Sequence, residues 1–223
     1  MYKKIIFLMA ASIILVPSIH AFSLRLNVPV TGSYEVGGCS ECSPKSGGYS
    51  IRGIFGMFGL GYAVGTFDWD YPSTSVTTDQ KLAANAVDLS GSFSFLTVGV
   101  GSVISGTLEG KYGYTNTETD EPATGYSRTQ TWVVDTKRVL DGSMTGTTSF
   151  INFNFGIGPI DLLVGYRMWN TKFKHKLVGT QKHTQTVTPD LGVNSSTTTS
   201  INQSGGETKM DFNQITAGIG FGF

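Results

Sequence analysis

The sequence is poor in charge, in cysteine and in histidine, and none of its hydrophobic runs is long. Charged residues make up 14% of the chain, against ~25% in ordinary globular domains. Two cysteines without a second pair cannot supply the roughly four ligands of a structural zinc site. No basic patch of the kind that binds nucleic acid stands out. We therefore expect no metal, no cofactor and no nucleic-acid partner.

Glycine and aromatic residues are abundant instead. There are 29 glycines in 223 residues, nearly twice the usual share of ~7%, and 12% of the residues are aromatic. About 200 residues is an ordinary length for one all-β domain, and no repeat with a solenoid period is visible. Low charge with many Gly, Ser, Thr and aromatic residues favours strands that have one apolar face.

The first 21 residues have the pattern of a secretory signal peptide. Lys3 and Lys4 form a basic start, residues 5–16 are almost wholly apolar, and the small residue Ala21 ends a cleavage site of residues 19–21. The apolar run is shorter than the roughly 20 residues of a spanning helix, which argues against the alternative of a retained anchor. We expect cleavage after Ala21 and a mature chain of residues 22–223.

The last nine residues alternate between two kinds of side chain. Thr or Gly occupies the even positions, and apolar residues occupy the odd ones: Ile215, Ala217, Ile219, Phe221 and Phe223. Successive side chains of a strand point to opposite faces, so this segment predicts a strand with one apolar face. It resembles the closing strand of bacterial outer-membrane barrels. The resemblance implies that these five residues form the signal read by the barrel-assembly machinery.

Seven further segments of alternating polarity can be placed upstream, which makes eight strands in all. The expected strands are 23–34, two within 49–71 joined by a turn near Gly59, 87–99, 104–114, 149–157, 161–169 and about 209–223. Within 87–99 the alternation changes phase at Leu96, which a β-bulge or an early turn would explain. Gly158-Pro159 predicts a tight turn between the sixth and seventh strands.

This pattern predicts an all-β fold, a transmembrane antiparallel up-and-down β-barrel of eight strands. Backbone polar groups find no partners in lipid, so a spanning sheet has to close on itself. With Phe223 on the periplasmic side, four long polar connectors lie outside the cell: 35–48, 72–86, 115–146 and 173–208. Several aromatic residues then lie near strand ends, either as a girdle at the bilayer surface or as ordinary strand residues: Tyr62, Trp69, Tyr112, Tyr114 and Tyr166.

As a pattern, the whole mature chain resembles the small eight-stranded outer-membrane barrels of the OmpA, OmpX and opacity-protein type. Only the final strand carries a motif-like match, and the connectors contain no family signature. The resemblance implies residence in the outer membrane of a Gram-negative cell after signal-directed export. It also implies that outer-membrane lipid and lipopolysaccharide surround the protein.

Cys39 and Cys42 form a C-x-x-C motif in a Gly-rich segment. An exported chain meets an oxidising compartment, so a local disulfide is the expected state. A thioredoxin-like redox centre would need a βαβ setting, which the alternation does not predict. The pair is interpreted as a staple of a loop tip.

Charged residues on the faces opposite the apolar ones are expected in the barrel interior: Arg25, Arg52, Glu109, Lys111, Asp161 and Arg167. The interior of an eight-stranded barrel is filled by side chains or holds one small ligand, and buried charges have to pair. These residues predict a salt-bridged plug. The alternative is a narrow polar path for small solutes or ions, and alternation does not distinguish the two.

The last long connector carries a cluster of basic residues: Lys172, Lys174, His175, Lys176, Lys182 and His183. The connector 115–146 carries Glu118, Asp120 and Glu121 instead. Solvated loops, or strands that continue above the membrane and pair across charge, explain both. The alternative is contact with lipopolysaccharide phosphates or with a host surface. The tract 194–206, rich in Ser, Thr, Asn and Gly, is expected to be mobile.

Two functions of different classes fit this pattern. One is a structural or interaction protein, a closed barrel that serves envelope integrity or presents its loops to an extracellular surface partner in adhesion. The other is a transport protein, either a small pore or a carrier of small or apolar solutes. A lipid hydrolase or acyltransferase is a third option, but His175 and His183 stand in no catalytic pattern, and Ser143 or Ser149 as nucleophile would be arbitrary. We expect no enzymatic activity and no catalytic residues.

Overall fold

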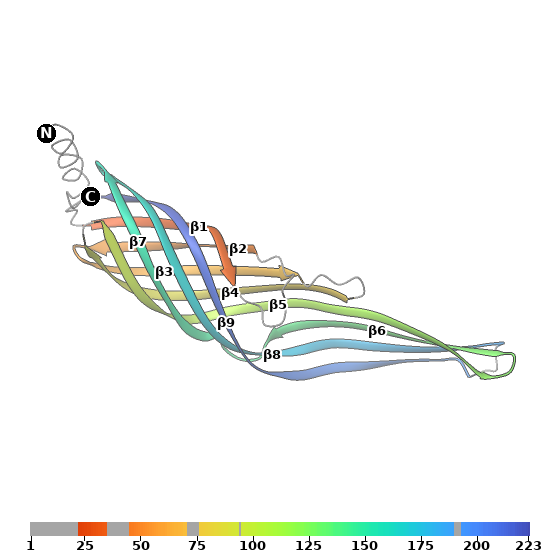
Figure 1. Ribbon diagram of the computed structural model, residues 1–223. Coiled ribbons are helices and arrows are strands. Elements are labelled where there is room, and N and C mark those ends of the chain that lie inside the picture. The colour runs from red at the N-terminus through yellow and green to blue at the C-terminus, as the bar shows by residue number, and fades with distance from the viewer. Residues whose placement is uncertain (1–21, 35–44, 71–75, 94, 190–192) are drawn as a thin grey trace, which may run out of the picture.

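The computed structural model describes residues 22–34, 45–70, 76–93, 95–189 and 193–223. They form one antiparallel sheet of nine strands (Figure 1). The strands are β1 (Phe22–Tyr34), β2 (Lys45–Phe55), β3 (Phe58–Asp70), β4 (Val76–Phe93), β5 (Leu96–Ala123), β6 (Tyr126–Leu140), β7 (Thr145–Ile157), β8 (Ile160–Thr188) and β9 (Ser195–Gly222). Within this part of the chain, no helix is long and apolar enough to cross a membrane.

Eight of the nine strands close into a hydrogen-bonded ring. Its order is β1–β2–β3–β4–β5–β7–β8–β9, and β9 pairs again with β1. The closing pair aligns Ser23 with Gly222 and Asn27 with Gly218. A ring leaves no unpaired strand edge over the length that its strands share. The ring therefore has the eight strands that the alternation predicts.

β6 and β7 are two parts of one interrupted strand. The first part of β5 pairs with β7 through residues 96–103, and its later part pairs with β6 through residues 109–123. β8 pairs with both strands in the same way. Residues 141–144 separate the two parts, and the buried side chain of Met144 turns inward at the break. This break raises the number of strands from eight to nine.

The two ends of the ring differ in construction. At one end, called the turn end, two-residue connections join β2 to β3, β4 to β5, and β7 to β8. The backbones of Phe22 and Phe223 are hydrogen-bonded there, so the described chain begins and ends at the same place (Figure 1). At the other end, β5, β6, β8 and β9 continue beyond the ring as a four-stranded sheet (Figure 1). This sheet, residues 115–123, 126–140, 175–188 and 195–204, is called the sheet extension.

Two expected turn positions are corrected by the structure. The turn expected near Gly59 lies at Gly56–Met57, where Gly56 has a φ of 60°, a conformation that costs glycine little. The expected strand 87–99 is divided between β4 and β5 by the connection at residues 94–95. An early turn, not a bulge, is therefore the reason for the change of phase at Leu96.

The expected long loops are corrected more strongly. Most of 115–146 and 173–208 is strand, and so is most of 72–86. The tract 194–206, expected to be mobile, lies in β9 apart from its first residue. In 115–131 and 179–204, polar residues occupy both faces, so there is no apolar periodicity by which a strand could be recognised.

Three sequence-based expectations lie outside the described residues. They are the signal peptide of residues 1–21, the connector segment 35–44 and the pair Cys39 and Cys42 within it. The cleavage site and the disulfide therefore stay predictions.

Candidate functional site

The half of the ring nearest the turn end is apolar outside and polar inside. On β8, Leu162 and Val164 are about half exposed, whereas Asp161 and Arg167 are buried. The other strands repeat this arrangement, with Leu24 outside and Arg25 inside on β1. The apolar side chains of the final strand also lie on the outer face, at Ile215, Ala217, Ile219, Phe221 and Phe223. The alternation thus places each of these side chains on the side that the sequence predicts.

Five buried ionic side chains form a charged layer across this interior: Arg25, Arg52, Asp88, Asp161 and Arg167. Arg25 Nη2 lies 3.2 Å from Asp161 Oδ2, and Arg25 Nη1 donates a 2.6 Å hydrogen bond to Thr97 Oγ1. Thr97 also accepts a 2.9 Å hydrogen bond from Asn154 Nδ2. Strands from opposite sides of the ring are therefore tied together through its centre.

Asp88 is the centre of the charged layer. Its two carboxylate oxygens bind different arginines, Arg52 Nη2 at 2.6 Å and Arg167 Nη2 at 3.0 Å. The Arg52 guanidinium carbon lies 3.8 Å from the centroid of the Phe150 ring, so the ring face adds a cation–π contact. Three arginines face two aspartates in this layer, and the aromatic ring helps to hold the excess positive charge.

Small residues make room for this ion cluster. A Cβ atom at Gly61 would collide with the Asp88 carboxylate and lie 3.1 Å from Arg52 Nε. Gly61 faces Asp88 across the β3–β4 pair. The position has to be glycine because the Asp88 carboxylate of the neighbouring strand occupies the space that a side chain would need.

The half of the ring nearest the sheet extension has an apolar interior. Its buried side chains, called the apolar layer, are Ala63, Phe67, Leu82, Ala84, Ala86, Val103, Leu108, Met144, Trp169, Phe173, Met210 and Phe212. The rings of Phe67 and Phe212 stack with centroids 3.8 Å apart. Trp169 donates a 2.8 Å hydrogen bond from Nε1 to Gln214 Oε1, so its polar atom is satisfied. This layer fills the ring between the charged layer and the sheet extension.

The outer face of the same half is polar. Exposed ionic residues point outward from β4, β5, β8 and β9, and they include Lys81, Glu109, Lys111, Lys172 and Lys209. Polarity therefore inverts along the ring. The half at the turn end is apolar outside and charged inside, and the other half is charged outside and apolar inside.

A small cavity lies between the two layers. It is bounded by Arg167, Trp169 and Gln214 and has a volume of about 10 Å³, which is room for about one water molecule. Four of the six residues expected to line a path for solutes are instead held in buried ion pairs: Arg25, Arg52, Asp161 and Arg167.

Glu109 and Lys111, expected inside, lie on the outer face and are exposed. The reason is a bulge at Ile104, which has no partner on β4 because Asn85 pairs with Ser105 and Ala86 with Val103. The extra residue exchanges the two faces of β5 beyond it. Leu108 is consequently buried in the apolar layer.

The basic residues expected in one loop are spread over both faces of β8. Lys172 and Lys176 are paired with Glu207 at 3.0 Å and Asp141 at 3.7 Å. His175 Nδ1 lies 3.4 Å from Thr208 Oγ1, and burial together with the nearby Arg138 lowers its pKa. The rings of His183 and Trp132 stack at 5.0 Å. Lys174 and Lys182 are exposed.

The acidic residues of the sheet extension include one well-formed ion pair. Arg128 donates two hydrogen bonds to Asp120, from Nε to Oδ1 at 2.8 Å and from Nη2 to Oδ2. This hydrogen bonding, with the attraction of opposite charges, lowers the pKa of Asp120. Glu118 accepts a 3.2 Å hydrogen bond from Asn116, and Glu121 is exposed.

The aromatic residues expected in a girdle separate into two groups. Tyr62 and Tyr166 lie on the outer face and are exposed. Tyr112 and Tyr114 lie on the opposite face, where their rings meet edge to face at 6.0 Å. The Trp69 side chain lies outside the described residues. Of the four tyrosines, Tyr62 and Tyr166 are oriented as a girdle requires.

Sequence reasoning did not single out Asp88 and Phe150, which hold two of the three interior arginines. Asp88 lies between the outward-facing Val87 and Leu89, and that alternation was a signal from which it could have been found. Phe150 is an apolar residue on a polar face, so alternation gave no sign of it.

The described residues do not form a recognisable catalytic or metal site. No group of three or more His, Cys, Asp or Glu residues in this part of the chain could hold a metal ion. Ser143 is exposed and Ser149 is half-buried, and neither is hydrogen-bonded to a histidine in the described chain.

No family model matches this sequence, and no curated protein matches it. Among solved structures, a major outer membrane protein from Thermus thermophilus matches at 11% identity, covering 91% of this chain and 98% of that chain, with a TM-score of 0.35. The outer membrane protease OmpT from Escherichia coli matches at 12% identity, covering 92% and 94%, with a TM-score of 0.21. OpdQ from Pseudomonas aeruginosa matches at 7% identity, covering 92% and 97%, with a TM-score of 0.13. TM-scores this low establish no relationship, so the function has to be argued from this chain's own geometry.

Proposed function

We propose that the chain is a transmembrane β-barrel of a bacterial outer membrane, with a closed interior and a structural or surface-interaction role. The inversion of polarity along the ring carries this proposal. A sheet surrounded by water buries its apolar side chains and exposes its charges, whereas a spanning sheet turns its apolar side chains toward lipid. The half at the turn end follows the second pattern, and the rest follows the first.

The dimensions of the apolar outer face support this proposal. On β8 the outward side chains are apolar from Ile160 to Met168 and polar from Asn170 onward. The part of the outer face at this height around the ring is called the apolar belt. These eight residue steps span roughly 26 Å along the strand at about 3.3 Å each. A tilt of about 40° reduces this to roughly 20 Å, close to the ~25 Å apolar band of outer-membrane barrels.

The closed hydrogen bonding of the ring is the second support. Lipid offers no partners for backbone N–H and C=O groups, so a spanning sheet can have no free edge. The β1–β9 pair closes the ring over the part of these strands that carries the apolar belt. The β1–β2 pairing ends at Asn27 and Ser50, and the longest open strand edges of the described sheet belong to the sheet extension, where water can solvate them.

The filled interior supports a structural or interaction role over transport. Asp88 binds two arginines at the centre of the ring, and the stacked Phe67 and Phe212 close it farther along. The sheet extension offers two polar faces to the surroundings and suits contact with an extracellular surface partner. Signal-directed export and recognition of the terminal strand by the assembly machinery belong to the same proposal, and no catalytic activity does.

Single-channel recording in planar bilayers tests the closed interior. The full chain, extracted from the outer membrane of an expression host, is added at high protein load, with a porin as positive control. We expect no conductance steps above the detergent background. Discrete, reproducible steps would overturn the sealed barrel and favour the pore.

Gel migration tests the membrane barrel itself. We expect the unheated chain to run at a different apparent mass from the boiled chain in detergent, because the closed ring resists unfolding. A chain that stays soluble in water without detergent, with one migration position, would contradict the proposal.

A further inference from the structure

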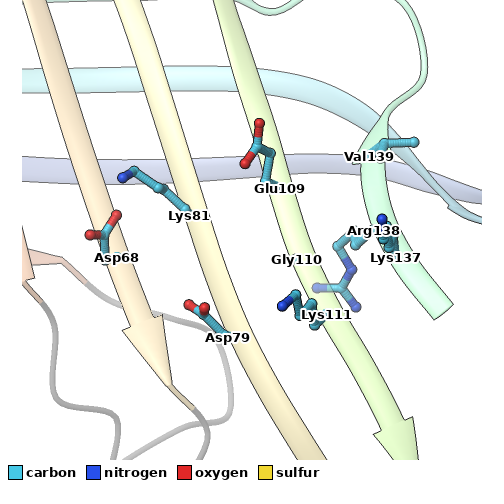
Figure 2. A pocket seen from close by; sticks show the side chains of 9 residues that line it. All are labelled: Asp68, Asp79, Lys81, Glu109, Gly110, Lys111, Lys137, Arg138 and Val139. Atoms are coloured by element: carbon cyan, nitrogen blue, oxygen red, sulfur yellow. The ribbon is translucent and has the colours of Figure 1, made fainter. Parts of the chain in front are cut away.

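A hollow of about 530 Å³ lies on the outer face where β3, β4 and β5 leave the apolar belt (Figure 2). Its charged lining comprises three carboxylates and three lysines, Asp68, Asp79, Lys81, Glu109, Lys111 and Lys137, together with Arg138. Their neighbours Phe67, Gln80 and Leu108 are buried in the interior. The six charged side chains alternate with these and therefore belong to the outer face.

The six groups form two rows across the strands (Figure 2). In the first, Asp68 faces Lys81 and Lys81 faces Glu109, so the charges alternate in sign. In the second, Asp79 faces Lys111, and Lys111 directly faces Lys137. Like charges that face each other across two strands are destabilising. The second row therefore places two lysines side by side, which the first row does not.

Neither lysine of this pair forms an ion pair with a described carboxylate. No carboxylate of the described residues lies within 4.0 Å of the Lys111 or Lys137 ammonium group, whereas Lys172 and Lys176 each have one. Both lysines of the hollow are exposed. A pair of adjacent ammonium groups beside a concave surface is suited to bind the oxygens of a phosphate.

We propose that this hollow binds the phosphorylated sugar headgroup of a lipid in the outer leaflet, with Lys111 and Lys137 on the phosphate. The inference rests on the proposed membrane location. Asp68 lies four residues beyond Val64 on the outer face of β3, roughly 13 Å along the strand. That position is beyond the hydrocarbon edge, at the height of a tall headgroup. The carboxylates of Asp79 and Glu109 accept hydrogen bonds from sugar hydroxyls, which explains why a phosphate site also contains acids.

The size of the hollow agrees with this class of ligand. A volume of about 530 Å³ falls within the roughly 300–1,000 Å³ of small-molecule sites. The hollow is therefore larger than a bare phosphate needs. Lysine stems are flexible and can reach along the sheet toward the bilayer. The site thus requires both the phosphate and the sugar, and an anionic phospholipid without sugar fits it less well.

Binding of a defined lipid to variants tests the proposal. The exported full chain is reconstituted in phosphatidylcholine nanodiscs, its folding is checked by heat-modifiable migration, and rough lipopolysaccharide is titrated in. We expect the double variant Lys111→Gln/Lys137→Gln to bind at least tenfold more weakly than the unchanged chain. The control Lys174→Gln/Lys182→Gln removes two exposed lysines of β8 and is expected to stay within twofold.

Three competitors distinguish the sources of the phosphate. Dephosphorylated lipopolysaccharide, phosphatidylglycerol and inorganic phosphate are each expected to compete at least tenfold less well than the phosphorylated form. Equal competition by inorganic phosphate or by phosphatidylglycerol would overturn the assignment to a sugar phosphate. An equal loss of affinity in both double variants would overturn the site. A chain that is inserted and folded but does not bind refutes this inference alone, whereas a chain that does not insert refutes the proposed function.

Discussion

The charged layer and the apolar layer are neighbours in one ring, yet opposite interactions hold them together. In the charged layer, Asp88 joins Arg52 and Arg167 through buried ionic hydrogen bonds. In the apolar layer, Phe67 and Phe212 stack, and aliphatic side chains fill the remaining space. The outer faces beside the two layers have the reverse polarity. The comparison teaches that the medium outside the ring decides what its interior can be made of.

The physical reason lies in where apolar area can be removed from water. In the proposed membrane location, water surrounds the sheet beside the apolar layer, so burying side chains such as Leu108 inside contributes about 25 cal/mol per Å². Beside the charged layer, the proposed lipid surroundings shelter the outward apolar side chains, so their place is outside. The interior is left to polar groups, which are stable there only when they are paired.

The largest expected effect comes from removing the shared acid of the charged layer. Asp88→Ala leaves Arg52 and Arg167 buried without their carboxylate, and breaking such a pair costs about 3–5 kcal/mol. The measurement is urea unfolding of the barrel in lipid vesicles. Asp161→Ala is the matched control and should cost less, because Arg25 keeps its hydrogen bond to Thr97. Equal losses in the two variants would contradict a central role for Asp88.

Truncation in the apolar layer is the next largest effect. Phe212→Ala removes a fully buried ring stacked on Phe67, and such changes cost about 3 kcal/mol or more. Unfolding in urea measures the loss, with Phe212→Leu as the control that should recover more than half of it. A loss below about 1 kcal/mol would show that this layer does not stabilise the ring.

A smaller effect is expected when a charge is placed on the outer face, and its size should depend on which half of the ring receives it. Val164→Arg places a charge in the apolar belt, where it should cost about 2–4 kcal/mol near the middle of the bilayer. Thr147→Arg places the same charge on the outer face beside the apolar layer and should cost nearly nothing. Unfolding free energies of both variants in vesicles give the comparison. Similar values would mean that the two outer faces meet the same medium.

The smallest effect is expected in the sheet extension. Arg128 lowers the pKa of Asp120 through hydrogen bonds and charge, so the pair's contribution is present above the unfolded value of about 3.9. It is lost as the pH falls through the lower folded value. Carboxylate NMR shifts follow the titration, and Arg128→Gln should return the pKa to about 3.9. Because both groups are exposed, the stability of the ring should not change; a ring that weakens with this titration would disprove the assignment.

The sequence predicted the half of the ring at the turn end well. Alternation in β8 and β9 placed Arg167 inside and Val164 and Ile219 outside, as the structure has them. It failed at Glu109, because a single unpaired residue, Ile104, exchanges the faces of β5. Periodicity can be read from the sequence, but a bulge depends on how the neighbouring strand aligns. It also failed for the sheet extension, where polar residues on both faces leave no period to detect.

The sequence by itself determined that the strands have two unlike faces and that the last one ends in alternating apolar residues. It predicted four of the five interior charges nearest the turn end, Arg25, Arg52, Asp161 and Arg167. Only the tertiary structure decided that Asp88 binds two arginines, that Leu108 turns inward and that Lys111 faces Lys137. The reason is that alternation separates the faces of one strand, whereas register and ring closure fix which face is enclosed and which distant side chains meet.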